Sequence, residues 1–321
     1  MPDFADILSK DAAMAPLTYY RIGGTARRLY RPRSPEEVAA LLADLTRQGE
    51  PWRVIGGGAN LLVCDGIHEE AIIATESLVG LTFADEGEAG GAVLVRAAAG
   101  ESFPRLVATT VRMALEGCEA LAGIPGQVGG ICAMNAGGRQ AEFGAVVAEV
   151  ELVSPEGERR CLSNRDGERS LSFSYRRCEL PPGIVTAVTL RLVRGDPANL
   201  RRRMSDILSA KKAAQPLGVP SSGCIFKNPG AESAGLLIER LGLKGERRGD
   251  AEISRRHGNF ILNRGAASSY DVLTLVELIE ERAQNEAGVE LEREIKIWAA
   301  TSSDSPTSLK GNPRPSFESE P

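Results

Sequence analysis

The spacing of apolar residues predicts amphipathic helices at several points of the chain. Ser34 and Glu37 form a capping-box pattern, which is typical of a helix start. The apolar residues that follow fall on one helical face: Val38, Leu41, Leu42 and Leu45. A second strong helix is predicted over residues 268–283, where Ser268 and Asp271 form a similar pattern. Further helices are predicted over residues 103–115, 199–212 and 234–241.

Short apolar or alternating runs predict strands between these helices. The predicted strands cover residues 52–55, 71–74, 78–83, 93–98 and 184–193. Residues 146–153 and 160–162 flank the turn Pro155-Glu156-Gly157, which together indicate a hairpin. Residues 289–297 alternate strictly and predict a closing strand, with Glu290, Glu292 and Glu294 on one face.

The order of these elements suggests how the chain is divided. Gly195-Asp196-Pro197 breaks the pattern after the strand at 184–193, and the helix over 199–212 is basic and polar. We place a domain boundary near this helix, and the last third is predicted to be α+β. From residue 301 onward Ser, Pro, Thr and charged residues dominate, so residues 301–321 are predicted to form a disordered tail.

Composition narrows the class of protein. The chain has 321 residues, of which 42% are hydrophobic and 25% charged, as in an ordinary globular protein of two or three domains. The net charge of −5 gives no indication of a nucleic-acid surface. No apolar stretch reaches the ~20 residues that span a bilayer, and the N-terminus lacks the apolar core of a signal peptide. We therefore expect a cytoplasmic protein.

Cysteine and histidine usage argues against a metal site. The two histidines are His68 and His257, and no two of the six cysteines form a CxxC pair. We expect no metal. In a reducing compartment most of the thiols are expected to be free and buried.

Two glycine-rich stretches are candidates for binding an anion through backbone N–H groups. Gly56-Gly57-Gly58-Ala59-Asn60 follows a predicted strand, but Leu61 stands where a dinucleotide fingerprint has its third glycine, and no P-loop lysine follows. On spacing alone a plain turn and a nucleotide site explain it equally well. Residues 123–138 form a longer glycine-rich stretch, for which a binding loop or a tight connection beneath a sheet are both possible.

Several motifs, in one order along the chain, resemble those of one enzyme family. IGGGANLLV at 55–63 and LAGIPGQVGGICAMNAG at 121–137 are similar to the two flavin-binding stretches of the UDP-N-acetylenolpyruvoylglucosamine reductases. YRIGGTA at 20–26, FSYRRCEL at 173–180, PSSGCIFKNP at 220–229 and LEREIKI at 291–297 also resemble family segments. So does the stretch 234–263, with its LKG and HGNF segments. The resemblance covers residues 16–300.

The resemblance implies an α+β protein with a two-lobed FAD-binding domain of the vanillyl-alcohol-oxidase (PCMH) type, followed by a smaller α+β substrate-binding domain. The expected boundaries are 1–19 for a lead-in, 20–197 for the FAD-binding domain and 198–300 for the substrate domain. FAD would be bound non-covalently and reduced by NADPH. It would then reduce an enolpyruvyl ether of UDP-N-acetylglucosamine to UDP-N-acetylmuramate, a cell-wall precursor. The partner is thus a small sugar nucleotide.

The resemblance also assigns site residues. The cofactor would be held by Gly56, Gly57, Gly58, Ala59, Asn60, Leu61, Gly123, Ile124, Pro125, Gly126, Val128, Gly129, Gly130, Asn135 and Gly137. The substrate would meet Tyr175, Lys227, Asn228 and His257. The tyrosine-bearing insertion of longer family members is absent, so this chain resembles the short variant. Gly138 to Ala141 depart from the aromatic-glycine pair that the family usually has there.

Three catalytic residues follow from the same motifs: Arg176, Cys224 and Glu294. Hydride addition to an enolpyruvyl group leaves an enolate, which an arginine can stabilise and a positioned acid must protonate. Cys224 stands where many family members carry a serine, and a thiol is the stronger acid. Without the motifs, the three would be a surface arginine beside Arg177, a buried inert thiol and one of a solvated stripe of acids. Nearby Lys227 can either speed proton donation or create a thiolate.

Two other readings of the chain stay open at this point. A different flavin oxidase or dehydrogenase of the same superfamily would explain the first two thirds of the chain, but not the segments at 220–229 and 234–263. A non-catalytic module that binds a flavin or a sugar nucleotide would explain the change from serine to cysteine. The presence of both Arg176 and Glu294 argues against it.

Overall fold

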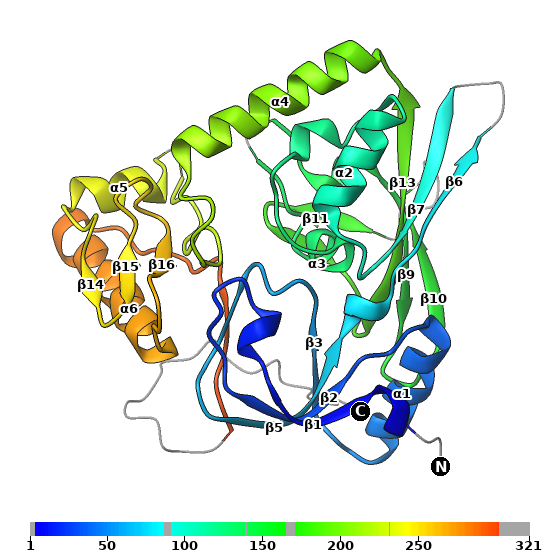
Figure 1. Cartoon of the computed structure of the whole chain (residues 1–321), viewed down its shortest axis with the longest axis horizontal. Coiled ribbons are helices and arrows are strands. Elements are labelled where there is room, and N and C mark those ends of the chain that lie inside the picture. The colour runs from blue at the N-terminus through cyan, green and yellow to red at the C-terminus, as the bar shows by residue number, and fades with distance from the viewer. Residues whose placement is uncertain (1–3, 87–90, 139, 165–170, 231, 302–321) are drawn as a thin grey trace.

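The computed structural model describes residues 4–86, 91–138, 140–164, 171–230 and 232–301. Figure 1 shows a first lobe at the bottom, a second lobe at the upper right and a smaller C-terminal part at the left. Helix α4 (Pro197–Ala214) runs along the top from the second lobe to the C-terminal part. Residues 302–321 of the predicted tail lie outside the described residues, and so does Arg139.

A four-stranded sheet with one helix forms the first lobe. Its strand order is β1 (Leu8–Ala13), β2 (Thr25–Tyr30), β5 (Ile67–Ala74) and β3 (Trp52–Ile55). β1 pairs antiparallel with β2, whereas β5 runs parallel to both β2 and β3. β1 lies within the segment that was expected to be a lead-in, so that segment supplies an edge strand of this lobe.

Helix α1 (Pro35–Arg47) covers the first lobe with the apolar face that its sequence predicts. Its side chains Val38, Leu41, Leu42 and Leu45 are buried. Ser34 accepts a hydrogen bond from the Glu37 N–H at 3.2 Å, which confirms half of the predicted capping box. The carboxylate of Glu37 accepts instead from the Arg33 N–H at 2.7 Å, one residue earlier than the pattern predicts.

The second lobe is an antiparallel sheet backed by two helices. Its strand order is β10 (Arg159–Ser163), β9 (Val147–Val153), β13 (Ile184–Arg194), β7 (Ala92–Ala98) and β6 (Leu81–Asp85), with β8 (Leu115–Glu116) paired to β13. Helices α2 (Phe103–Arg112) and α3 (Val128–Ala133) share one apolar core with this sheet. The pairing of β9 with β10 confirms the predicted hairpin.

A small hairpin of the second lobe presents the YR motif. Strands β11 (Ser172–Ser174) and β12 (Arg177–Glu179) pair antiparallel, and Tyr175 and Arg176 form the turn between them. Arg176 has φ +59°, in the left-handed region that few residues other than glycine adopt. The turn therefore gives Arg176 a left-handed backbone conformation, which a residue in an extended strand does not have.

The C-terminal part packs two helices against a small sheet. It contains α5 (Ala234–Arg240), β14 (Arg247–Arg248), β15 (Ala251–Ile253), β16 (Ile261–Asn263) and α6 (Ser269–Ala287). Both halves of the capping box between Ser268 and Asp271 are present, as predicted. The chain then returns to the first lobe, where β17 (Lys296–Trp298) pairs parallel with β4 (Leu61–Val63).

The predicted closing strand over residues 289–297 is largely wrong. Only Lys296–Trp298 form a strand, and residues 290–295 follow the loop around Ile225 instead of a sheet. The amides of Glu294 and Ile295 both donate to the Ile225 carbonyl, at 2.8 and 3.3 Å. Alternation marked Leu291 and Ile295 as buried, which the structure confirms. It could not show that the hydrogen bonds of this segment go to a loop distant in sequence instead of to a neighbouring strand.

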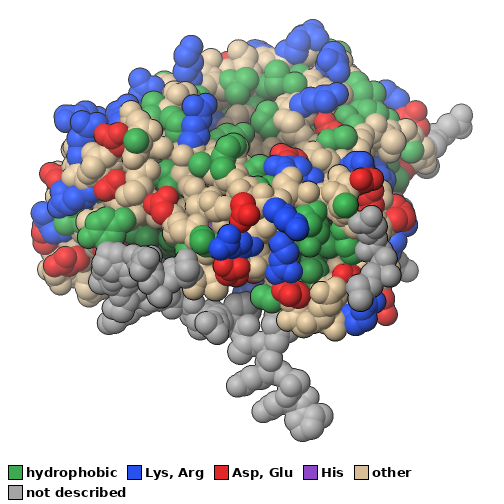
Figure 2. Space-filling view, turned by 60° about the horizontal axis from the view of Figure 1, so that its bottom comes forward, with side chains coloured by type: hydrophobic (Ala, Val, Ile, Leu, Met, Phe, Trp, Pro, Cys, Tyr) green, Lys and Arg blue, Asp and Glu red, His purple; other side chains and the backbone are tan. Residues whose placement is uncertain are grey.

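The remaining short elements are single-turn 3₁₀ helices. They cover Ala5–Ile7, Ala15–Leu17, Thr75–Ser77, Glu119–Leu121 and Phe143–Val146. Among the described residues, none of the helices is both long and apolar enough to cross a bilayer. The face in Figure 2 carries acidic and basic side chains interspersed with one another.

Candidate active site

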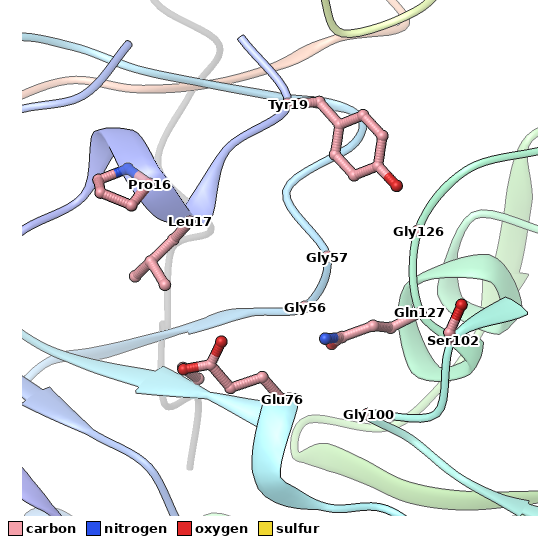
Figure 3. Close-up of a pocket in the computed structure, with 11 residues that line it drawn as sticks. Pro16, Leu17, Tyr19, Gly56, Gly57, Glu76, Gly100, Ser102, Gly126 and Gln127 are labelled. Atoms are coloured by element: carbon pink, nitrogen blue, oxygen red, sulfur yellow. The ribbon is translucent and has the colours of Figure 1, made fainter. Parts of the chain in front are cut away.

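The two glycine-rich stretches face each other across a cavity of about 260 Å³ (Figure 3). Gly56 and Gly57 follow β3 of the first lobe, whereas Gly126 and Gln127 precede α3 of the second lobe. The side chain of Gln127 points across the cavity toward Gly56. The other residues that line it are Pro16, Leu17, Tyr19, Ala74, Glu76, Gly100 and Ser102.

Close backbone packing explains why this cavity needs glycine. A Cβ atom at Gly57 would lie 2.9 Å from the Cα of Gly126, in the facing loop. At Gly58, where φ is +60°, a Cβ would lie 2.1 Å from the Leu17 carbonyl oxygen. By contrast, no described atom outside its own helix and chain neighbours lies within 4 Å of the position that a Cβ would take at Gly130. Gly57 lets the two lobes meet, Gly58 lets its loop pack against the N-terminal segment of its own lobe, and Gly130 leaves the backbone open.

The start of α3 offers a backbone donor. The amides of Val128 and Gly129 donate to the carbonyls of Glu101 and Ala99, at 3.0 and 2.8 Å. The next amide, that of Gly130, has no acceptor among the described residues. An open N–H at a glycine-lined helix start fits the diphosphate of a dinucleotide cofactor.

Other residues predicted to hold the cofactor have supporting positions. Leu61 and Val128 are buried in the cores of their lobes, and Ile124 packs partly against the second. The side chains of Asn60 and Asn135 hydrogen-bond to backbone carbonyls of Glu294 and Ser174. The remaining predicted residues do not line the cavity. Gly58, Ala59, Gly123 and Pro125 lie in the two loops beside it, Gly129 and Gly130 lie in the first turn of α3, and Gly137 follows that helix.

Arg176 and Glu294 form a partly buried ion pair, although 118 residues separate them. The Arg176 Nε lies 2.8 Å from the Glu294 Oε1, and their side chains are only 17% and 14% exposed. Burial raises the pKa of the Glu294 carboxyl, whereas Arg176 lowers it by charge and by this hydrogen bond. The Arg176 guanidinium also stacks 4.9 Å from the centre of the Tyr175 ring. The sequence predicted these residues separately, and the fold brings them together.

Cys224 lies beside this ion pair. Burial and, to a smaller extent, the Glu294 carboxylate raise the pKa of its thiol, Arg176 lowers it, and together they bring the pKa to about 12. The thiol is therefore protonated at neutral pH, as a proton donor must be. Lys227, which the sequence places near the thiol, binds the Glu292 carboxylate instead, with 2.6 Å between its Nζ and Oε1.

The residues predicted to bind substrate differ in what they contact. Tyr175 is 46% exposed and borders Arg176. Asn228 accepts a hydrogen bond from the Ala234 N–H at 3.1 Å and so supports the start of α5. His257 packs edge-on against Phe260, and burial, followed by the charge of Lys244, lowers its pKa. His257 is thus neutral at pH 7 and packs against its own domain.

Sequence reasoning missed part of the cavity lining. Pro16, Leu17 and Tyr19 come from the expected lead-in, where no motif marks them. The sequence did contain a signal for Gly100 and Ser102, because they stand at the turn between a predicted strand and a predicted helix. A Cβ at Gly100 would lie 2.0 Å from the Thr75 carbonyl oxygen. This strand-to-helix turn is a third glycine-dependent contact at the same cavity.

Comparison with protein families gives two matches that together cover most of the chain. Residues 26–163 match the model described as FAD binding domain. Residues 215–298 match the model described as UDP-N-acetylenolpyruvoylglucosamine reductase, C-terminal domain. The first match contains both glycine-rich stretches, and the second contains Cys224 and Glu294.

Curated relatives and a solved structure extend the match to nearly the full length. The UDP-N-acetylenolpyruvoylglucosamine reductase of Syntrophobacter fumaroxidans is 40% identical over 88% of this chain and 82% of its own. That of Moorella thermoacetica is 38% identical over 88% of this chain and 90% of its own.

The crystal structure of the same reductase from Thermus caldophilus, 37% identical, superposes with a TM-score of 0.76. It covers 91% of this chain and 99% of that one. These matches confirm the predicted fold of a two-lobed FAD-binding unit followed by an α+β domain. The chain belongs to the UDP-N-acetylenolpyruvoylglucosamine reductase family.

Proposed function

We propose that this chain reduces UDP-N-acetylenolpyruvoylglucosamine to UDP-N-acetylmuramate, with NADPH as the reductant of its FAD. The observation that carries the proposal is the meeting of Arg176, Glu294 and Cys224 at one place in a flavin-binding fold. An anion-binding cation, a carboxyl group and a protonated acid are the groups that the reduction of an enolpyruvyl ether requires.

The cavity between the lobes supports FAD as the cofactor. Gly57 and Gly126 are in backbone contact there, and the open Gly130 amide is a donor for a phosphate oxygen. Bound FAD supplies the hydride chemistry, which no side chain of this chain can perform. Gly56, Gly57, Gly126 and Gln127 are the residues that would hold it from both sides.

Arg176 stabilises the enolate that hydride addition at C3 produces. Its planar guanidinium suits the substrate carboxylate, into which the negative charge is delocalised. The ion pair with Glu294 and the stacking on Tyr175 fix the guanidinium before the substrate arrives, so that little reorganisation is needed during the reaction. Glu294 orients Arg176 and polarises the acid end of the substrate.

Cys224 gives its proton to C2 of the enolate. The C–H bond forms as the S–H bond breaks, and the thiolate left behind lies near the positive charge of Arg176. The thiol then regains a proton from solvent. In total NADPH, one proton and the substrate give NADP⁺ and the reduced product. A thiol whose pKa is raised by burial stays loaded with its proton until the enolate forms.

Rapid mixing under anaerobic conditions tests this proposal. We expect NADPH to bleach the flavin absorbance of the purified FAD-loaded protein. Addition of UDP-N-acetylenolpyruvoylglucosamine should then restore the absorbance and yield a product with two additional hydrogens. Restoration by O₂ alone, without any response to the sugar nucleotide, would show an oxidase instead. Binding of both ligands without any NADPH oxidation would show a non-catalytic module.

A further inference from the structure

The three catalytic residues lie where regular secondary structure does not hold them. Arg176 stands in a two-residue turn at φ +59°. Cys224 lies in the loop between α4 and α5, and Glu294 lies in the segment before β17. Because loops are more mobile than helices and strands, some other contact has to fix these three positions.

An asparagine from a different segment clamps the backbone next to each of them. The Asn60 Nδ2 donates to the carbonyl of Glu294 itself at 3.0 Å. The Asn60 carbonyl accepts in turn from the Lys296 N–H at 3.1 Å, two residues after Glu294. The first glycine-rich stretch, which ends at Asn60, is thereby joined to the segment that carries the catalytic carboxylate.

Asn135 does the same for Arg176. Its Nδ2 donates to the Ser174 carbonyl at 2.9 Å and to the Glu142 carboxylate at 2.9 Å. Its Oδ1 accepts from the Gly144 N–H at 2.8 Å. Asn135 is 1% exposed and has φ +40°, a conformation that asparagine tolerates better than most residues.

Asn259 holds the cysteine loop with both ends of its carboxamide. Its Oδ1 accepts from the Phe226 N–H at 2.9 Å, and its Nδ2 donates to the Phe226 carbonyl at 2.8 Å. Its own carbonyl accepts from the Ile225 N–H at 3.0 Å, directly after Cys224. Asn259 is 2% exposed. These bonds favour a positioning role for Asn259.

We propose that Asn60, Asn135 and Asn259 are positioning residues, whose carboxamides set the relative placement of Glu294, Arg176 and Cys224. The inference rests on the proposed function. A carboxamide suits the task because it both donates and accepts but carries no charge. A charged clamp so close to the ion pair would itself move the protonation of the acid groups.

Asn60 gives the cleanest test because it is only partly buried, so that its replacement leaves no sealed cavity. For Asn60→Ala and the isosteric Asn60→Asp, we expect the reoxidation of reduced flavin by the sugar nucleotide to slow about 10- to 100-fold, since small misplacements have such effects. FAD affinity and substrate affinity, measured by titration, should change less than about threefold. A parallel loss of FAD affinity would make Asn60 a cofactor contact and overturn its assignment.

Asn263 is a matched control for the buried pair. It is 4% exposed, its Nδ2 donates to the Tyr20 carbonyl at 3.0 Å, and its Oδ1 accepts from the Ala267 N–H at 3.1 Å. Like Asn135 and Asn259, it is a buried asparagine whose carboxamide both donates to and accepts from the backbone, but it clamps none of the three catalytic segments. We expect all three alanine variants to unfold at lower temperature. Only Asn135→Ala and Asn259→Ala should slow substrate reduction, and an equal slowing in Asn263→Ala would contradict the proposal.

A double variant separates positioning from an independent contribution. Because Asn60 acts through Glu294, Asn60→Ala should cost little further rate in a Glu294→Gln background. Independent, multiplicative losses would overturn the inference. If the parent protein does not reduce the sugar nucleotide at all, the proposed function fails and the inference falls with it. If the parent is active and Asn60→Ala matches it, the inference alone fails.

Discussion

The cavity between the lobes and the proposed catalytic group of Arg176, Glu294 and Cys224 are built in opposite ways. The cavity depends on side chains that are missing, because Gly57 and Gly58 allow backbone contacts that any Cβ would block. The catalytic group depends on side chains that are present and drawn from three distant segments. A cofactor that is retained through many turnovers needs shape and backbone donors. A reaction that creates charge needs charged and acidic groups fixed in advance.

Removal of the cation from the catalytic group should have the largest effect. We expect Arg176→Ala to slow reduction of the sugar nucleotide about 10³-fold, as loss of a preorganised oxyanion partner does. NADPH should still bleach the flavin at close to the parent rate. Arg177→Ala is the control, because that side chain is 70% exposed and lies on the next residue. Similar losses in both variants would remove Arg176 from the catalytic group.

Removal of the acid should come next. We expect Cys224→Ala to slow turnover about 10²-fold, within the usual contribution of general acid catalysis, while NADPH still reduces the flavin. Cys224→Ser should keep substantial activity, since a hydroxyl can also donate a proton. Both variants are compared with the parent by their steady-state and single-turnover rates. Turnover of Cys224→Ala at the parent rate would show that another group donates the proton.

A change on the cavity side should affect binding instead of the reaction. At Gly57 a methyl group would lie 2.9 Å from backbone of the facing loop, so Gly57→Ala should lower FAD affinity about tenfold by forcing the loops apart. Gly138→Ala is the control, because no described atom lies near its Cβ position. Flavin titration of both apoproteins makes the comparison. If Gly57→Ala instead slowed the reaction at full FAD occupancy, the cavity would contribute to the reaction as well as to cofactor binding.

The smallest effect concerns stability and pH. Burial raises the folded-state pKa of Glu294 above its unfolded value, so its ionised form costs stability once the pH exceeds the unfolded pKa. Glu294→Gln should therefore be slightly more stable than the parent near neutral pH. The advantage, a few degrees in unfolding temperature, should vanish as the pH falls below the unfolded pKa. Calorimetric scans at several pH values measure the difference in unfolding temperature between Glu294→Gln and the parent. A variant that is less stable than the parent at neutral pH would contradict the prediction.

Local patterns predicted most of the secondary structure. Capping residues and helical spacing placed α1 and α6, and a turn between alternating runs placed the β9–β10 hairpin. These features arise from residues a few positions apart, whose preferences act before the chain is folded. The closing segment failed for the opposite reason, because its hydrogen bonds go to the loop around Ile225, far away in sequence.

Motifs in the sequence determined the family, and they singled out the two glycine-rich stretches and Arg176, Cys224 and Glu294 as the candidate site residues. Only the tertiary structure decided that Arg176 and Glu294 pair across 118 residues, that Lys227 turns to Glu292, and that three asparagines clamp the catalytic segments. The physical reason is the distance along the chain over which each effect acts. A glycine or a cap acts on its immediate neighbours, whereas the strength of an ion pair and the pKa of a thiol depend on which distant segments the fold packs around them.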